Sequence, residues 1–141
     1  KPYINSDPIL VMNGDSYIEF PIESLIKKQN GHLASILIYS QSNSSDFGHV
    51  ELNKSGLLMS FNEKIEKNKS TFINGGRYVF SNLIFDYFPS EKQFSLEYHV
   101  FPKLAKQSHI ISLIVDSKSF DIGTPARLFD AREILKRKLN D

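Results

Sequence analysis

The chain has 141 residues, of which 40% are hydrophobic and 12% aromatic, a composition that suits one globular domain and excludes a disordered segment. Its 17 basic and 16 acidic residues leave a net charge of +1, which argues against nucleic acid or an anionic membrane as a partner. No cysteine is present, so disulfides and thiolate chemistry are excluded. No apolar run approaches the roughly 20 residues of a spanning helix, and we expect a cytoplasmic protein.

The first predicted elements form a parallel unit. Residues 8–12 (PILVM) and 33–39 (LASILIY) are continuous apolar runs typical of buried strands. Between them, residues 22–30 place their apolar side chains on one helical face, and Gly31 can end that helix. A strand, a helix and a strand with nearly unbroken apolar strands predict a parallel βαβ unit.

An exposed loop and a hairpin follow this unit. Residues 40–46 (SQSNSSD) are polar and turn-rich, which predicts a surface loop. Residues 47–52 (FGHVEL) and 57–63 (LLMSFNE) flank the turn NKSG at 53–56, and this pattern predicts an antiparallel hairpin closed by Gly56.

The remaining chain predicts two strands and three helices. The strands are 72–80 (FINGGRYVF) and 110–115 (IISLIV); the helices are 82–88, ended by Pro89, 95–107, which Pro102 should bend or divide, and a closing helix with Thr124 as N-cap and Pro125 in its first position. Leu128, Leu135 and Leu139 should line one face of that closing helix. Together these elements predict an α/β fold: a Rossmann-like, mostly parallel mixed sheet flanked by helices, with an inserted antiparallel hairpin.

Two carboxylates follow predicted strands. Asp15 comes directly after the first strand, and Asp121 precedes the closing helix. Mg²⁺ needs few protein ligands beside phosphates, so the two could share one cation if their strands are neighbours. A strand-end Asp is more often a turn former, and Asp121 fits equally well a role at the helix entrance.

Other polar or flexible positions have ordinary and functional interpretations. Glu63 and Lys64 form a pair that is usually just solvated, but Glu63 could accept hydrogen bonds from hydroxyls while Lys64 holds a phosphate. Asn74, Gly75 and Gly76 interrupt a strand pattern, which indicates a bulge or a close approach to a ligand, and Gly48 gives a weaker signal of the same kind. The four histidines lack zinc-site spacing, and GxSxG, GxGxxG and Walker motifs do not occur.

Six segments in order resemble one family, the sugar-1-phosphate nucleotidyltransferases or nucleotide-sugar pyrophosphorylases. They are NGDSY (13–17), FG (47–48), SFNEK (60–64), INGGRYVF (73–80), SLEYHVFP (95–102) and FDIGTP (120–125). Within the family the chain most resembles guanylyltransferases that act on D-glycero-D-manno-heptose 1-phosphate or mannose 1-phosphate.

The resemblance implies a GT-A-like fold and transfer of a nucleoside monophosphate, from GTP by the closest resemblance, to a sugar 1-phosphate with release of pyrophosphate. By matching motifs, Asp15 and Asp121 would hold Mg²⁺ and Lys64 the phosphate of the sugar phosphate. Gly14 would let the backbone turn near the nucleotide. The sugar pocket would be lined by Gly48, Glu63, Asn74 and Gly76.

The sequence departs from the family pattern in several places. The glycine-rich triphosphate loop GGxGTRL does not occur, and the chain starts KPYINSDP without a methionine. We therefore expect residues 1–141 to be the C-terminal, sugar-phosphate-binding portion of a single domain, with little transferase activity alone, and we expect its exposed sheet to favour a homodimer. Ile65 stands where proline is common, and Arg77 stands where an apolar residue is commoner.

Two alternatives belong to other classes. A non-catalytic sugar-phosphate-binding or regulatory module would keep the pocket, but it would not need the second metal carboxylate or the combination of Asp15, Asp121 and Lys64. A flavodoxin-like signalling domain would explain parallel strands but not the hairpin, SFNEK or FDIGTP.

Overall fold

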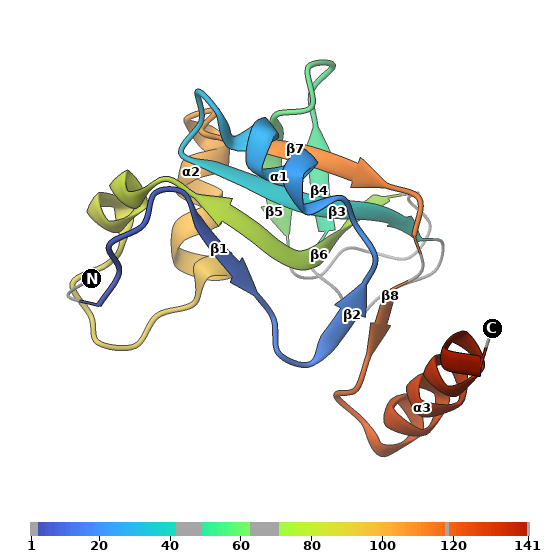
Figure 1. Ribbon diagram of the computed structural model, residues 1–141. Coiled ribbons are helices and arrows are strands. Elements are labelled where there is room, and N and C mark those ends of the chain that lie inside the picture. Colours follow the sequence, from blue (N-terminus) through green and yellow to red (C-terminus); the bar gives the residue numbers. More distant parts are fainter. Residues whose placement is uncertain (1–2, 42–48, 63–70, 118, 141) are drawn as a thin grey trace.

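The computed structural model describes residues 3–41, 49–62, 71–117 and 119–140 (Figure 1). Its main sheet has six strands in the order β5-β4-β6-β3-β7, with β1 also paired to β6. These are β1 (Ile9–Met12), β3 (Ala34–Gln41), β4 (His49–Leu52), β5 (Leu58–Asn62), β6 (Thr71–Phe80) and β7 (Ile110–Val115). A separate two-stranded sheet consists of β2 (Ser16–Ile18) and β8 (Ser119–Asp121).

Helices lie on both faces of the main sheet, so the predicted α/β class is confirmed. The helices are α1 (Ile22–Gln29), α2 (Phe101–Lys106) and α3 (Pro125–Asn140), with a 3₁₀ helix η1 (Asn82–Tyr87) and a π-helical turn η2 (Leu96–Val100). In Figure 1, α3 stands apart from the main sheet, beside β8.

The predicted parallel βαβ unit is wrong. β1 pairs antiparallel with β6, and the parallel partner of β3 is β7. Leu10 and Met12 are 39% and 54% exposed, so alternate side chains of β1 face outward. An apolar run of four residues does not distinguish a strand buried on both faces from an antiparallel strand at a sheet edge. Among the described strands of the main sheet, parallel pairing is confined to β3 and β7.

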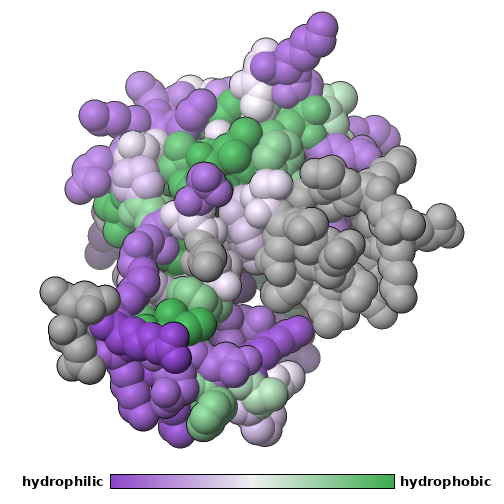
Figure 2. Space-filling model, turned by 90° about the vertical axis from the view of Figure 1, so that its right-hand side faces the viewer, coloured by the Kyte–Doolittle hydropathy of each residue, from purple (hydrophilic) through white to green (hydrophobic). Residues whose placement is uncertain are grey.

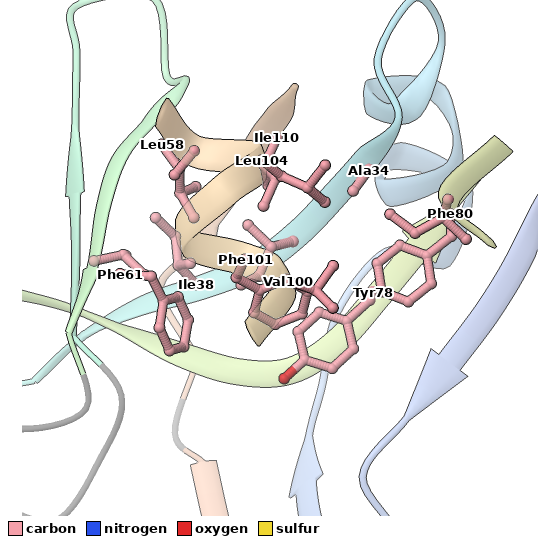
Figure 3. Packing of buried hydrophobic residues seen from close by; sticks show 14 residues of the cluster. Ala34, Ile38, Leu58, Phe61, Tyr78, Phe80, Val100, Phe101, Leu104 and Ile110 are labelled. Atoms are coloured by element: carbon pink, nitrogen blue, oxygen red, sulfur yellow. The ribbon is translucent and has the colours of Figure 1, made fainter. Parts of the chain in front are cut away.

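Strand β3 is the middle of the core because both of its faces are covered. Its even-numbered residues Ile36 and Ile38 belong to the cluster under α2, where Phe101 packs against Tyr78 with ring centroids 5.0 Å apart (Figure 3). Its odd-numbered residues, such as Leu37, pack with Leu25 of α1 on the opposite face. The unbroken apolar run of this strand is thus explained by burial on both sides.

The predicted hairpin is confirmed for its described residues. Strands β4 and β5 are antiparallel, and the side chain of Asn53 accepts hydrogen bonds from the backbone N–H groups of Ser55 and Leu57. Gly56 has φ +82°, a conformation that glycine adopts without strain. Its carbonyl accepts hydrogen bonds from the backbone N–H (2.9 Å) and hydroxyl (2.8 Å) of Ser112, which anchors the turn to β7.

The predicted helix over 95–107 is divided. Ser95 caps a π-helical turn, and α2 then begins at Phe101 with Pro102 in its first turn. The prediction that Pro102 bends or divides the helix is therefore confirmed. The predicted start of the closing helix is confirmed too, because the Thr124 hydroxyl accepts a hydrogen bond from the Arg127 N–H at 3.3 Å.

The two glycines of β6 form a bulge. The register between β3 and β6 shifts between Ile36, opposite Tyr78, and Ile38, opposite Asn74. Gly76 has φ +65°, and a Cβ there would lie 2.6 Å from the Asn13 amide nitrogen Nδ2. The predicted bulge is confirmed, and the close approach is made by the turn that follows β1.

Apolar surface remains outside the core. The face in Figure 2 has an apolar area in its upper middle, bordered by hydrophilic residues, and is mostly hydrophilic below. Ile22 and Ile26 of α1 and Ile114 of β7 are 36%, 38% and 52% exposed. Such a surface is compatible with association, and the homodimer stays a prediction.

We predict that Gly76→Ala lowers the free energy of unfolding by about 1–3 kcal/mol, because alanine is strained at this φ and its methyl group displaces Asn13. Gly14→Ala is the matched control, since no atom lies within 4 Å of a Cβ at that position. It should change the stability by less than about 0.5 kcal/mol. Urea unfolding of both variants measures the difference, and equal losses would contradict the assigned role of the bulge.

Candidate functional site

The pairing of β2 with β8 brings Asp15, the residue before β2, close to Asp121, the last residue of β8. Ser16, directly after Asp15, lies opposite Asp121 in the antiparallel register. The Asp15 carbonyl accepts a hydrogen bond from the Ile122 N–H at 2.9 Å, so the backbones of the two segments are fixed to each other. The sequence argument for a shared cation required the strands at 8–12 and 110–115 to be neighbours, and this is wrong, because β1 pairs with β6 and β7 pairs with β3. The two carboxylates are brought together instead by the β2–β8 pairing, which the sequence did not predict.

Asp15 and Asp121 are both among the residues that line one polar cavity of about 260 Å³. Its walls come from the turn after β1, the bulge of β6, the end of β3, and the segment from β8 to α3. The lining residues are Asn13, Asp15, Ser16, Tyr39, Asn74, Gly75, Gly76, Ser119, Asp121, Gly123 and Arg127. Side-chain amide, hydroxyl and carboxyl groups, with glycine backbones, suit a polar ligand rather than an apolar one.

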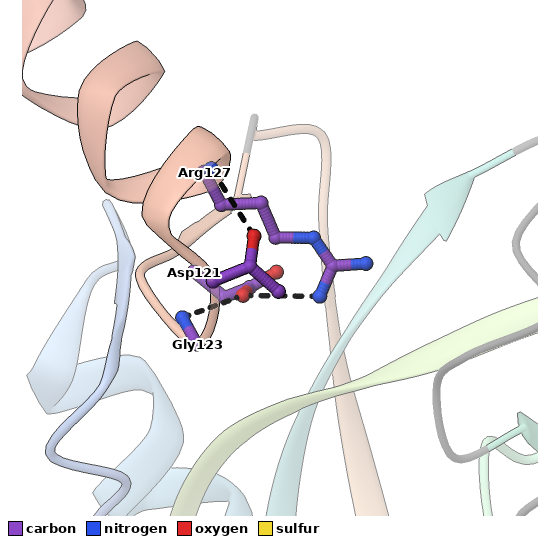
Figure 4. A network of polar contacts seen from close by, with 4 residues as sticks. Asp121, Gly123 and Arg127 are labelled. Atoms are coloured by element: carbon purple, nitrogen blue, oxygen red, sulfur yellow. Dashed lines mark hydrogen bonds and ion pairs between the residues drawn. The ribbon is translucent and has the colours of Figure 1, made fainter.

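The carboxylate of Asp121 also organises the start of α3. Its oxygen Oδ1 accepts hydrogen bonds from the Gly123 N–H (3.0 Å) and from Arg127 Nη1 (3.2 Å), as Figure 4 shows. This is the helix-entrance role that the sequence left open. The other oxygen, Oδ2, takes part in neither bond, so the same side chain can serve both the helix and a ligand in the cavity.

Asn74 lies at the centre of a second polar group. Its Nδ2 donates to the Tyr78 hydroxyl and to Glu97 Oε1, both at 2.7 Å, and its Oδ1 accepts from the Gly76 N–H at 3.0 Å. Burial raises the pKa of Tyr78 far above its ordinary value, so this hydroxyl stays protonated at neutral pH. Both amide hydrogens of Asn74 are used, which leaves Oδ1 as the atom that can still accept a bond from a ligand.

Sequence reasoning did not single out Glu97 or Arg77 as site residues. Glu97 stands in the π-helical turn η2, and single π-helical turns are frequent at functional sites; the motif SLEYHVFP was the signal that could have found it. Arg77 was noted only as a departure from the family pattern. It lies beneath the turn that carries Asp15.

The remaining predicted site residues have different positions. Gly14 is outside the lining of the cavity and has no positive φ, so the backbone does not require glycine there. Gly48, Glu63 and Lys64 lie outside the described residues. Their roles, like that of Gly14 beside a nucleotide, stay predictions.

The family model described as Nucleotidyl transferase matches residues 2–138. The chain belongs to the nucleotidyl transferase family. It is 31% identical over 124 residues to the mannose-1-phosphate guanylyltransferase catalytic subunit beta of Xenopus tropicalis, covering 86% of this chain and 34% of the relative. It is 29% identical over 143 residues to a UTP–glucose-1-phosphate uridylyltransferase of Synechocystis, covering 96% of this chain and 37% of the relative.

The fold of this nucleotidyl transferase chain is also found in solved structures. HddC from Yersinia pseudotuberculosis superposes with a TM-score of 0.79 at 24% sequence identity, over 95% of this chain and 58% of that one. The chain thus spans about a third of the length of the curated relatives that it matches. The predicted family and fold are confirmed. In the described part of the chain, no helix is both long and apolar enough to span a membrane.

One ion pair anchors the far end of α3. Lys138 donates a hydrogen bond to Glu19, which follows β2, and its Nζ lies 5.9 Å from the centre of the Tyr17 ring. The bond from Lys138, with a smaller contribution from the Tyr17 hydroxyl, lowers the pKa of Glu19. Because the folded state favours the ionised carboxylate, this contribution to stability is present above the ordinary pKa of glutamate and is lost as the pH falls through the lowered one.

We predict that Lys138→Met raises the pKa of Glu19 toward its ordinary value, because the donor that stabilises the carboxylate is removed. Lys136→Met is the matched control, since Lys136 pairs with Glu133 instead. An NMR titration of the Glu19 carboxyl carbon in the three proteins gives the measurement. An unchanged Glu19 pKa in Lys138→Met would show that α3 is not held at this point.

Proposed function

We propose that this chain acts in the transfer of a nucleoside monophosphate from a nucleoside triphosphate to a sugar 1-phosphate, with release of pyrophosphate. The observation that carries the proposal is the pairing of β2 with β8, which puts Asp15 and Asp121 beside one polar cavity in a chain of this family. The guanylyltransferase relative favours GMP as the transferred group, and the uridylyltransferase relative shows that other bases occur among similar proteins.

The reaction needs little covalent chemistry from the protein. An oxygen of the sugar phosphate attacks the α-phosphorus of the triphosphate, a new P–O bond forms, and the bond between the α- and β-phosphates breaks. The attacking phosphate is already anionic, so no strong general base is required. The barrier falls through alignment of the two phosphates and neutralisation of their charge.

The donor set of the cavity fits Mg²⁺. Among the described residues there is no group of three or more His, Cys, Asp or Glu side chains that could enclose a metal. Mg²⁺ usually binds through one or two carboxylates and completes its coordination with waters and substrate phosphates. Asp15 and Asp121 would supply such a pair, and the bound ion would neutralise charge on the phosphates. Their oxygens would hold and orient it.

The other wall of the cavity suits a sugar. Asn74 can offer Oδ1 to a hydroxyl, and Gly75 and Gly76 contribute backbone to the same wall. Glu97 holds the Asn74 amide in position. We propose that residues 1–141 form the sugar-phosphate-binding portion of the domain, with Glu63 and Gly48 completing the sugar pocket and Lys64 holding the sugar phosphate.

We predict that the chain binds mannose 1-phosphate or heptose 1-phosphate and that Lys64→Ala weakens the binding about 10- to 100-fold, the effect of losing one hydrogen bond from a charged group. Lys54→Ala is the matched control, because Lys54 is an exposed residue of the β4–β5 turn. Calorimetric titration with and without Mg²⁺ gives the affinities. Equal weakening in both variants would exclude Lys64 as the phosphate group's partner, and no binding by the unsubstituted chain would refute a sugar-phosphate site formed by these residues.

We also predict little or no pyrophosphate release when the 141-residue chain is mixed with GTP, Mg²⁺ and a sugar 1-phosphate. The GGxGTRL loop that the family uses to hold the triphosphate does not occur in the sequence. An enzyme-coupled pyrophosphate assay measures the rate. Full turnover by the chain would contradict the assignment of these residues to the sugar-phosphate portion alone.

A further inference from the structure

Arg77 is a buried cation at the edge of the bulge in β6. Its exposed fraction is 6%. A buried charge is costly unless polar partners surround it. Burial lowers the pKa of Arg77, and the nearby Tyr78 and Asp15 groups act against that shift. The hydrogen-bond partners of this guanidinium therefore indicate its role.

The guanidinium of Arg77 binds the turn that carries Asp15. Nη1 donates to the Ser16 hydroxyl (3.1 Å), to the Asn13 carbonyl (3.4 Å) and to the Gly76 carbonyl (3.0 Å), while Nη2 donates to the Ser16 carbonyl. Three of these four acceptors belong to residues 13–16. Asp15 lies between the two residues that the guanidinium holds.

Ser16 is also the point at which the two sheets are joined. It is the first residue of β2 and lies opposite Asp121 of β8. The small β2–β8 sheet is separate from the main sheet. A backbone bond from the Asn13 N–H to the Gly76 carbonyl (2.8 Å) links the turn to β6, and Arg77 adds three bonds to the same turn.

We propose that Arg77 is a positioning residue, which fixes the small sheet to the bulge of β6 and so sets where Asp15 and Asp121 stand in the cavity. Arg77 is not among the residues that line the cavity, which separates this role from direct contact with a ligand. Arginine suits the task because its planar guanidinium directs several donors in fixed directions, which a lysine ammonium does not do.

The metal part of this inference rests on the proposed function. Mg²⁺ demands nearly ideal octahedral geometry, so a small displacement of one carboxylate weakens its binding. Replacing a residue that orients a metal ligand typically weakens metal binding about 10- to 100-fold. The mechanical part does not need a metal, because it concerns the attachment of β2–β8 to the main sheet.

The test compares Arg77→Met and Arg77→Lys with the exposed control Arg132→Met in the 141-residue chain. Mn²⁺ affinity is measured by electron paramagnetic resonance, and amide hydrogen exchange is followed by NMR without metal. For Arg77→Met we expect about 10- to 100-fold weaker Mn²⁺ binding and about tenfold faster exchange of the Ile122 amide, which is bonded to Asp15. Arg77→Lys should recover part of both, and Arg132→Met should change neither.

If Arg77 merely stabilised the fold, its replacement would accelerate amide exchange throughout the main sheet. The proposed role predicts that the exchange rates of the amides in the β3–β7 ladder stay unchanged. Unchanged exchange at Ile122 in Arg77→Met would overturn the inference, as would an equal acceleration throughout the main sheet. Ser16→Ala removes one acceptor of Arg77 and keeps the test decisive where Arg77→Met does not fold; it should accelerate exchange at Ile122 by a smaller factor. Absence of Mn²⁺ binding by the unsubstituted chain would refute the proposed metal site, and the exchange data would still decide the role of Arg77.

Discussion

The bulge in β6 is the constraint on which the rest of the site depends. Gly76 adopts a positive φ and leaves space for Asn13, so the turn after β1 can lie directly against the strand. Asn74 and Arg77, on either side of the two glycines, then contact different parts of the molecule. Asn74 reaches Glu97 at one wall of the cavity, and Arg77 reaches Ser16 beneath the other.

The hydrophobic core supports this bulge from one side. The ring of Tyr78 packs against Phe101, while its hydroxyl accepts a hydrogen bond from Asn74. One side chain thus belongs to the core through its ring and to the cavity through its oxygen, which is the usual use of a buried tyrosine. Tyr78 thus links the packing of α2 over the sheet to Asn74, which lines the wall that we propose for the sugar.

Much of the fold could be predicted because it follows from local chemistry. The β4–β5 turn has glycine where φ is positive, Thr124 caps α3, and Pro102 divides a helix. The partner of β1 could not be predicted, since strand pairing is set by contacts far along the chain that an apolar run does not encode.

The candidate site shows the same division. Asp15, Asp121 and Asn74 were selected as candidates because they follow strands or interrupt a strand pattern, and all three line one cavity in the structure. Arg77 and Glu97 were not selected because their importance comes from partners that are distant in sequence: Ser16 for Arg77, and Asn74 for Glu97. Sequence reasoning finds residues whose local setting is unusual, and it misses those whose setting is made by the fold.

The pairing of β6 with strands from distant parts of the chain bears on the order of folding. The β4–β5 hairpin closes over a short turn, which costs little chain entropy. Pairing of β1 with β6 closes a loop that contains β2, α1, β3, β4 and β5, and such non-local pairings form slowly. The turn that carries Asp15 directly follows β1, so its bonds to Gly76 and Arg77 form beside that pairing. We therefore expect the hairpin to form before the cavity during folding.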